Sequence, residues 1–225
     1  MRRTLKLITL MFFTVVYCIP SKSQCNHINS TFKAGEVISY EVYYNWGFIW
    51  LNAGWVDFKV KAAKFQGKDV YHFDGIGESH SNYDWLYKVR DRYQTYIDKE
   101  SMLPLWFLRK NDEGGYKVTN QYYFHHDKNI AYTFTENSDK PYVEDTVEIK
   151  DCTLDILTLV YYMRNYNFDI MSENEKIPVN CILDNELFDW YARYLGKETI
   201  KDRRGKEFLC HKFSAMLIEG TIFKG

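Results

Sequence analysis

Three cationic side chains recur at every second position near the middle of the chain. Lys88, Arg90 and Arg92 alternate with Val89 and Asp91. Alternate side chains of a β-strand point to the same face, so the three cations would share one face. Such a stripe can bind an anionic head group or a phosphate through charge-assisted hydrogen bonds. It more often pairs with acidic side chains on neighbouring strands, so both interpretations stay open for these three candidate ligand-binding residues.

Four acidic residues near this stripe are candidates for acid–base chemistry, namely Glu78, Asp84, Asp91 and Asp98. Glycoside hydrolysis requires two carboxyl groups at a defined separation, which the sequence does not fix. The sequence has no nucleophile elbow, phosphate-binding glycine loop or zinc-protease motif. We therefore predict no catalytic residue.

Aromatic side chains crowd two segments of the chain, one around Trp46 and Trp50 and the other around Trp85. Aromatic rings line sugar-binding and lipid-binding pockets because they provide a large apolar area with few rotatable bonds. They also have a high strand propensity and fill the cores of β-sheets. We interpret most of them as core residues and keep Trp46, Trp50 and Trp85 as candidate ligand-binding residues, with the turn 46–50 as an exposed rim.

The cysteine spacing favours one or two structural disulfides, or simply buried thiols, over a metal site. The chain has five cysteines, of which Cys18 lies in the export signal described below, and the disulfide candidates are Cys25, Cys152, Cys181 and Cys210. No two of these four have Cys-x-x-Cys spacing, and an adjacent histidine on a strand points to the opposite face. We predict no metal site and no cofactor. Four cysteines allow three pairings, and we prefer Cys25 with Cys152, which would fix the mature N-terminus near the one predicted helix.

Residues 1–23 have the features of an export signal. Arg2, Arg3 and Lys6 precede an apolar run over residues 7–19, and small residues follow at 21–23. The apolar run is shorter than the roughly 20 residues that span a bilayer. We expect cleavage after residue 23 and a single mature domain over residues 24–225 with no transmembrane span.

Composition and charge exclude several classes of protein. The 225 residues include 29 basic and 30 acidic side chains, a net charge of −1, and 46% of them are hydrophobic, as in an ordinary globular protein. Loss of residues 1–23 removes four basic residues and no acid, which leaves a net charge of −5. Such a protein has no general electrostatic reason to bind nucleic acid. A lipid anchor at Cys25 is not expected either, because Gln24 does not fit the position before a lipidated cysteine.

Period-two alternation predicts β-strands over most of the mature chain. The predicted strands cover residues 37–46, 49–65, 69–78, 89–98, 103–110, 116–126, 130–135, 142–149, 177–183, 187–199 and 208–218. Short turns between long strands indicate an antiparallel meander. Apolar residues on every side of the segment 154–166 predict a buried helix instead. We therefore expect an all-β, mainly antiparallel fold, which is a curved sheet or partly open barrel of about ten strands with one buried helix.

Several segments together resemble an exported-protein family known as domain of unknown function 3108. They are residues 32–40, Asp84–Asp91, Leu103-Pro104, Trp106-Phe107, Glu113–Tyr116, Lys212–Ser214 and Glu219-Gly220. The resemblance implies a β-barrel-like protein of the periplasm or outer-membrane periphery of a Gram-negative bacterium. It brings no catalytic residue. Members of the family usually continue past Glu219-Gly220 with another hairpin, which implies that this chain lacks its last strands.

Three functions are compatible with these features. We expect a non-catalytic envelope protein whose curved sheet binds a lipid or another apolar or amphipathic ligand, with the buried helix as plug or lid. The alternative is a structural or assembly partner of envelope or surface-polysaccharide machinery that uses the aromatic rim as its contact surface. A carbohydrate-active hydrolase is the third and least favoured function.

Overall fold

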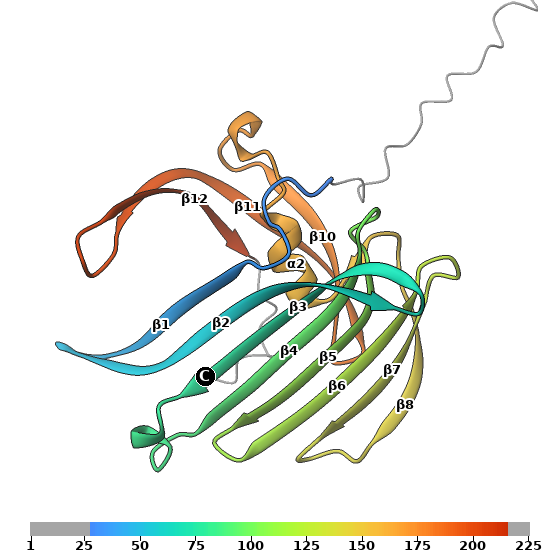
Figure 1. The fold of residues 1–225 in the computed structure, drawn as a ribbon, viewed down its shortest axis with the longest axis horizontal. Coiled ribbons are helices and arrows are strands. Elements are labelled where there is room, and N and C mark those ends of the chain that lie inside the picture. The colour runs from blue at the N-terminus through green and yellow to red at the C-terminus, as the bar shows by residue number, and fades with distance from the viewer. Residues whose placement is uncertain (1–27, 216–225) are drawn as a thin grey trace, which may run out of the picture.

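The computed structural model describes residues 28–215, which form two β-sheets and one short α-helix (Figure 1). The larger sheet has eight antiparallel strands in the order of the sequence, so each strand pairs with its neighbours along the chain. Its strands are β1 (Val37–Trp46), β2 (Ile49–Phe65), β3 (Lys68–Ser79), β4 (Val89–Asp98), β5 (Pro104–Glu113), β6 (Tyr116–His125), β7 (Ile130–Asn137) and β8 (Val143–Glu148). A single 3-10 turn, η1 (Ser81–Tyr83), lies in the crossover from β3 to β4.

The second sheet has four strands in the order β12-β11-β10-β9. They are β9 (Thr153–Leu154), β10 (Lys176–Leu183), β11 (Glu186–Lys201) and β12 (Glu207–Ala215). The short strand β9 pairs in parallel with β10, and the other pairs are antiparallel. Between β9 and β10 the chain forms the helix α2 (Ile156–Met163) and the 3-10 turn η2 (Phe168–Ile170). Helix α2 contacts β3 and β4 on one side and β10 on the other, so it lies between the two sheets (Figure 1).

Strand alternation gives the larger sheet two distinct faces. Val60, Phe73 and Phe107 belong to the same buried cluster as Leu157 of α2, so they point to the face that α2 covers. The intervening residues, such as Arg92, point to the opposite face. We call the face that carries α2 the inner face and the opposite one the outer face.

Asp155 fixes where α2 begins and ties it to the larger sheet. Its side chain accepts hydrogen bonds from the backbone N–H groups of Leu157 and Thr158, both at 2.9 Å, which is the usual geometry of an N-cap. The hydroxyl of Thr95 on β4 donates to the same carboxyl group at 3.0 Å. Asp155 is fully buried, and this burial raises its pKa to about 6. One carboxyl group therefore caps the helix and joins it to the sheet.

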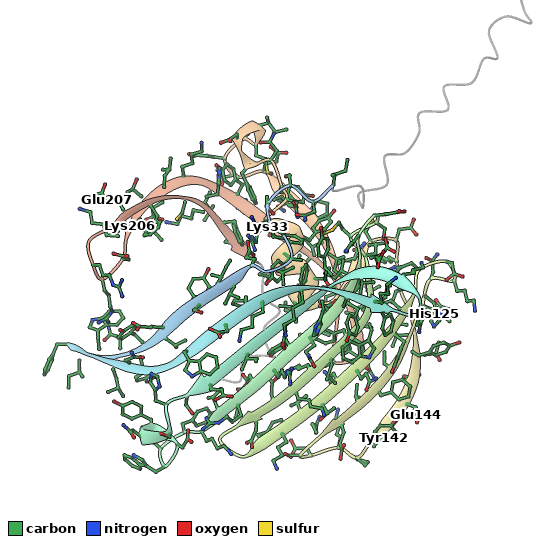
Figure 2. The ribbon with its side chains drawn as sticks, in the orientation of Figure 1. Lys33, His125, Tyr142, Glu144, Lys206 and Glu207 are labelled. Atoms are coloured by element: carbon green, nitrogen blue, oxygen red, sulfur yellow. The ribbon has the colours of Figure 1, made fainter. Side chains whose placement is uncertain are left out.

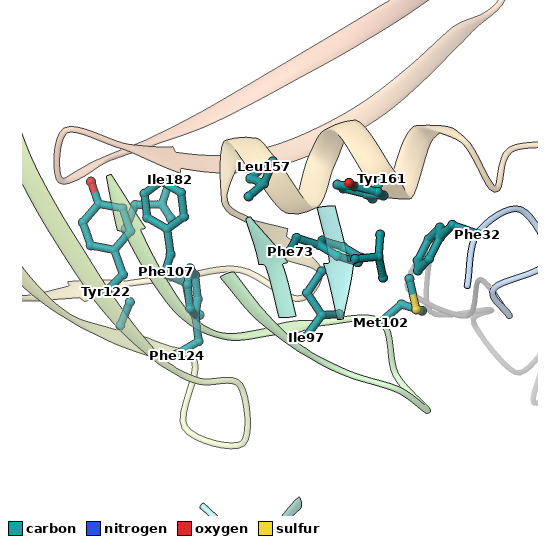
Figure 3. Close-up of a cluster of buried hydrophobic side chains, with 13 residues drawn as sticks. Phe32, Phe73, Ile97, Met102, Phe107, Tyr122, Phe124, Leu157, Tyr161 and Ile182 are labelled. Carbon is teal, nitrogen blue, oxygen red and sulfur yellow. The ribbon is translucent and has the colours of Figure 1, made fainter. Parts of the chain in front are cut away.

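Aromatic side chains form the main core between α2 and the inner face (Figure 3). The ring of Tyr161 on α2 stacks on Phe73 with 3.8 Å between their centroids. Phe32, which precedes β1, packs edge-on against both rings. Ile97 and Leu157 complete the contact, and all five side chains are at least nine-tenths buried. Their burial holds the helix on the sheet through the hydrophobic effect.

The second sheet has its own buried cluster and also reaches back to the first sheet. Ile177, Cys181 and Trp190 belong to the cluster that packs beneath α2 and η2. At the far end, the guanidinium carbon of Arg203 lies 3.5 Å from the centroid of the Tyr43 ring on β1. Arg203 belongs to the turn between β11 and β12, whose end is marked in Figure 2 by the labels of Lys206 and Glu207. A cation–π contact therefore joins the tip of this hairpin to β1.

The predicted fold class is confirmed, with three differences of detail. The strands form two sheets rather than one, because the parallel pair β9–β10 starts a separate ladder. The helix is shorter than the segment 154–166, because Leu154 is extended in β9 and Asp155 is the N-cap. The strand predicted over 103–110 continues to Glu113, and the turn contains only Gly114 and Gly115. The end of the strand predicted over 208–218 lies outside the described residues.

Candidate functional site

A cavity of about 600 Å³ lies on the inner face of the larger sheet, beside the part that α2 covers. Val42, Val56 and Gly77 contribute to its lining from β1, β2 and β3. Gly75, two residues earlier on the same face, lies against the helix, since a Cβ there would be 3.6 Å from Leu157 Cδ1. The cavity therefore begins where the helix stops covering the sheet. Its volume is within the usual range for small-molecule sites.

Because Gly77 has no side chain, the space above it on the inner face belongs to this cavity. A Cβ at this position would lie 3.5 Å from Val56 Cγ2 and 3.9 Å from Asp91 Cβ, which are ordinary van der Waals distances. Strand packing therefore does not require glycine here. A larger side chain at Gly77 would extend into the cavity without pushing the strands apart.

Gly54, which also lines the cavity, has a different role. A Cβ at Gly54 would lie 2.2 Å from the carbonyl oxygen of Glu78 on β3. The adjacent Ala53 is skipped in the β1–β2 register, where a bulge separates Val42 from Tyr43. The structure therefore has both a close approach of strands and a bulge at Ala53-Gly54. This glycine lets β2 and β3 approach each other at the edge of the cavity.

The crossover between β3 and β4 forms one side of the cavity. Tyr83, Leu86 and Tyr87 line it, and the last two are 66% and 54% exposed, so the cavity opens to solvent beside them. The Tyr87 ring lies against the β5–β6 turn, where a Cβ on Gly114 would be 2.6 Å from Tyr87 Cε2. The crossover therefore packs across the ends of β4 and β5.

A hydrogen-bond network built on Asp84 holds this crossover in place. The hydroxyl of Ser79 donates to Asp84 Oδ1 at 2.6 Å, and Arg90 donates to both carboxyl oxygens of Asp84 at 3.1 and 2.6 Å. The hydrogen bond from Ser79 and those from Arg90 lower the pKa of Asp84 below its ordinary value. Because the pairing is bidentate, it fixes the orientation of the crossover as well as its position.

A group of polar side chains on β4 and β5 adjoins the cavity at Asp91, the one member of the group that lines it. We call Asp91, Arg109, Asn111 and Glu113 the polar wall. Asp91 lines the cavity and is the direct partner of Asn111 in the β4–β5 ladder. The amide of Asn111 donates to Glu113 Oε1 at 3.1 Å and to the Tyr93 hydroxyl at 2.9 Å. Beside the cavity, the inner face of β4 and β5 thus carries these polar residues.

Three buried atoms of the polar wall have no hydrogen-bond partner among the described residues, namely Asp91 Oδ1, Arg109 Nε and Asn111 Oδ1. Asn111 is only 6% exposed, and buried polar groups usually find a partner. Burial and the neighbouring Glu113 carboxylate raise the pKa of Asp91 to about 7. The positive charge of Arg109 partly opposes this rise in the pKa of Asp91. Arg109 is itself paired with Asp184 Oδ1 at 3.1 Å.

The three predicted cationic residues point away from the cavity, and each has an acidic partner. Lys88 Nζ lies 3.8 Å from Asp112 Oδ2. Arg90 binds Asp84 as described, and Arg92 Nε lies 3.1 Å from Oδ1 of the buried Asp74. These ion pairs correspond to the second interpretation of the cationic stripe, in which its side chains pair with nearby acidic residues. Their role in anion binding stays a prediction that we do not carry into the proposed function.

Of the predicted aromatic residues, Trp50 and Trp85 do not line the cavity, although the adjacent Leu51 and Leu86 do. Trp50 is 57% exposed, and its ring centroid lies 5.3 Å from the guanidinium carbon of Arg203. Trp85 is 82% exposed in the crossover. Trp46 ends β1 opposite Ile49, and its side chain lies outside what the structure describes. We call Trp50, Trp85 and the exposed turn residue Phe48 the aromatic rim.

The structure places the predicted cysteines as follows. Cys181 is buried and Cys210 half-buried, and both are free thiols, so neither takes part in the predicted disulfides. Their positions explain this, because Cys181 belongs to the apolar cluster of β10 and Cys210 lies on β12 opposite Glu198. Cys152 is not among the free thiols. Its preferred partner Cys25 lies outside the described residues, so that pairing stays a prediction.

Over residues 28–215, no group of three or more histidine, cysteine or acidic side chains is placed to hold a metal ion. Within the same residues, no helix is long and apolar enough to cross a membrane. The Nε2–H group of His126 donates a hydrogen bond to the Pro104 carbonyl oxygen at 2.9 Å.

Sequence reasoning missed most of the residues that form this site. It singled out Asp91 only as a carboxylate, and it did not identify Gly77, Leu86 or Asn111. One signal was present, because Gly75 and Gly77 are two residues apart on a predicted strand and therefore share a face. Two glycines on the inner face of a sheet indicate missing side-chain volume there.

The fold and the site define a mainly β protein in which two sheets enclose a short helix and leave a mostly apolar cavity with Asp91 in its lining. The chain belongs to the family described as Protein of unknown function (DUF3108), whose family model matches residues 39–225. The resemblance stated from the sequence is thereby confirmed. No curated protein and no solved structure matches the chain.

Proposed function

We propose that this protein is a non-catalytic binding protein of the cell envelope, which holds an apolar or amphipathic ligand in the cavity on the inner face. The observation that carries the proposal is the cavity itself, with a volume of about 600 Å³ and a lining of mostly apolar residues. Burial of a ligand's hydrocarbon surface there contributes about 0.8 kcal/mol for each methylene group.

The exposed side chains at the opening support this function. Tyr44, Leu86 and Tyr87 line the cavity while more than half of each is exposed. Several large apolar side chains exposed together at one opening are typical of a binding site. The surfaces of soluble proteins rarely carry contiguous apolar patches that have no function.

The carboxyl groups beside the cavity give less support to a hydrolase. Asp91 and Glu113 are close enough for Glu113 to raise the pKa of Asp91 through a direct side-chain interaction. Glycosidases hold their two carboxyl groups about 5 Å or more apart, so that a sugar or a water molecule fits between them. We therefore assign these residues to binding.

The envelope location is part of the proposal and rests on the sequence of residues 1–23. Their basic start, short apolar run and small residues have the order of a cleaved export signal. Fractionation of cells that express the chain with a C-terminal tag should place the mature protein in the periplasm or with the outer membrane. Retention of the full-length chain in the cytoplasm would contradict this part of the proposal.

Titration with N-phenylnaphthylamine tests the binding function. This uncharged aromatic probe fluoresces strongly only in an apolar environment. We expect saturable fluorescence with one site per chain, and displacement of the probe by monolauroylglycerol. Fluorescence that stays at the level of free probe, or that rises without saturation, would contradict the proposal.

A second candidate function is docking to a partner protein of the envelope, and the aromatic rim favours it. Phe48 and Trp85 are 93% and 82% exposed and do not line the cavity. Interface cores are enriched in aromatic residues. Crosslinking in cells from a photoreactive residue at position 48 should then trap one constant partner, whereas a diffuse or absent product would remove this candidate.

A further inference from the structure

A hollow of about 270 Å³ lies on the outer face of the larger sheet, on the side opposite to the cavity. Its lining comes from β6, β7 and the segment just before β8. Tyr123 of this lining directly follows Tyr122, which belongs to the buried cluster beneath α2. Neighbouring side chains of a strand point to opposite faces, so Tyr123 points to the outer face. The hollow is therefore separate from the cavity that the proposed function uses.

The lining of this hollow combines aromatic rings with hydrogen-bonding groups. The Tyr123 ring meets the Phe134 ring edge-on, with 5.9 Å between their centroids, and the Phe134 centroid lies 6.3 Å from that of Tyr142. Tyr142 is more than half exposed. The remaining residues of the lining are polar, namely Thr119, Gln121, Thr135 and Glu136. A ligand in the hollow therefore meets apolar ring surfaces and polar groups together.

A second hollow continues the site along β6. It has a volume of about 640 Å³, and Tyr123 lines both hollows. Thr119 and Gln121 line the first hollow and His125 lines the second, so alternate residues of β6 belong to one continuous row. The strand spans about 20 Å from residue 119 to residue 125. This length favours an extended chain of several units over a single small molecule.

The charges of the first hollow select against an anionic chain. Glu136 is its only charged lining residue, and the Tyr142 hydroxyl donates to Glu144 Oε1 at 2.9 Å beside it. Tyr142 and Glu144 lie next to each other at the β8 edge of the sheet (Figure 2). A carboxylate or phosphate in this hollow would meet two acidic side chains and no cation of the lining.

The second hollow has an acidic excess as well. Lys68 is the one lysine or arginine in its lining, and its Nζ lies 4.0 Å from Asp98 Oδ2. Glu100 and Asp127 line the same hollow. An anionic chain would therefore be repelled along the whole length of the site.

Neutral sugars match this combination of groups. The C–H groups of a sugar ring form apolar faces that pack on aromatic rings. The hydroxyl groups at its edge both donate and accept hydrogen bonds, as the amide of Gln121 and the hydroxyl of Thr119 also do. A hydrocarbon chain would cover the rings but would leave the polar groups of the lining without partners.

We propose that the outer face of β6 binds an extended chain of neutral sugars, with one sugar unit in the hollow between Tyr123, Phe134 and Tyr142. This is a second binding site, and it is independent of the proposed function because it lies on the other face of the sheet. The aromatic rings supply the stacking surface, and Gln121, Thr119 and Glu136 supply hydrogen bonds to the hydroxyl groups.

Isothermal titration calorimetry with defined oligosaccharides tests this inference. The neutral probes are cellohexaose, maltohexaose and β-1,4-mannohexaose, and the anionic probe is hexagalacturonate. We expect saturable one-to-one binding of at least one neutral probe. Hexagalacturonate should bind at least about fivefold more weakly than the tightest neutral probe, because repulsion between like charges close to each other at a surface has that magnitude.

Tyr142→Ala and a matched control locate the site. Tyr142 precedes β8 and is 54% exposed, whereas Tyr40 on β1 is 57% exposed and lines neither hollow. Tyr142→Ala should weaken binding of the tightest neutral probe by about fivefold or more, since it removes a stacking surface. Tyr40→Ala removes an equally exposed ring from the opposite edge of the sheet and should leave the affinity unchanged. Circular dichroism of both variants shows whether they are folded.

The inference is wrong if none of the three neutral probes binds the wild-type protein, or if hexagalacturonate binds as tightly as they do. Equal affinities of Tyr142→Ala and Tyr40→Ala would also contradict it. Displacement of N-phenylnaphthylamine by the bound oligosaccharide would place the sugar in the cavity and overturn the assignment to the outer face. The proposed function does not depend on these results, since it concerns the inner face.

Discussion

Gly77 of β3 and Asp91 of β4 face each other across the strand ladder, and a Cβ on Gly77 would lie 3.9 Å from the Asp91 Cβ. The position that leaves the cavity open is therefore directly beside the carboxyl group that begins the polar wall. This relationship joins the two halves of the site. It also means that a substitution at Gly77 can reduce ligand binding without unfolding the protein.

We predict that Gly54→Ala destabilises the protein, whereas Gly77→Ala does not. The new Cβ at Gly54 would lie 2.2 Å from the Glu78 carbonyl oxygen, a backbone atom that can move only with its strand. Overpacking of this kind costs about 1–3 kcal/mol. The Cβ at Gly77 would meet its nearest neighbour at 3.5 Å. Urea unfolding of both variants measures the difference, and equal midpoints would show that the β2–β3 approach is not tight.

Asp155 should make the stability of the protein depend on pH. Burial raises its folded pKa to about 6 from an ordinary value of 3.8, so the folded state binds its proton more tightly than the unfolded state does. The stabilising contribution is therefore complete below about pH 4 and decreases as the pH rises through 6, by up to about 3 kcal/mol.

The variant Asp155→Asn isolates this effect, because asparagine is an equally good N-cap and does not titrate. Relative to Asp155→Asn, the free energy of unfolding of the wild-type protein should decrease between pH 4 and 7. A constant difference would show that Asp155 has an ordinary pKa. Asp155→Ala should be less stable than Asp155→Asn by about 1 kcal/mol or more, since Leu157 and Thr158 would lose their acceptor.

The titration of Asp91 reports on the polar wall. Its pKa of about 7 is raised by burial and by Glu113, so Glu113→Gln should lower it towards the ordinary range. Carboxyl carbon shifts followed by NMR measure this change. A pKa near 4 in the free wild-type protein would contradict this account of the wall.

Arg203 should control how firmly the β11–β12 hairpin rests on β1. Its guanidinium carbon lies 3.5 Å from the centroid of Tyr43, and a contact of this kind contributes about 0.5–1 kcal/mol at an exposed site. Arg203→Ala should therefore increase amide hydrogen exchange in residues 43–50 with little change in global stability. Arg204→Ala removes the same charge from the next residue and is the control. Equal effects of the two variants would assign the contact to charge alone.

Local patterns were sufficient to predict most of the elements. The strands β1, β2 and β4 begin and end where period-two alternation predicts, and the apolar segment after Cys152 contains the only α-helix of the described residues. The bulge near Ala53 was also predictable, since Gly54 within a strand marks a close approach. These features depend on residues that are neighbours in the chain.

The site was less predictable because it depends on residues far apart in the sequence. The position of α2 on the sheet determines that Gly75 is covered and Gly77 is open, and no local pattern contains that information. The cationic stripe was visible in the sequence, but its acidic partner Asp74 is 18 positions away from Arg92. Aromatic residues such as Trp85 stood out by type, although Leu86 beside it lines the cavity.

The central claim is that the cavity on the inner face holds an amphipathic ligand, and Gly77→Leu tests it. The leucine side chain would occupy the space above the sheet, and each displaced methylene group of a ligand contributes about 0.8 kcal/mol, so the affinity should decrease by about tenfold or more. Ala62→Leu adds the same side chain at an exposed position of β2 outside the cavity and serves as the control.

The most direct measurement is native mass spectrometry of the wild-type protein and both variants, purified from cells that export them. We predict that the wild-type protein and Ala62→Leu carry an additional mass of a small amphipathic molecule, and that Gly77→Leu does not. A wild-type protein with no additional mass that also fails to take up monolauroylglycerol, or an equal load on Gly77→Leu, would contradict the account.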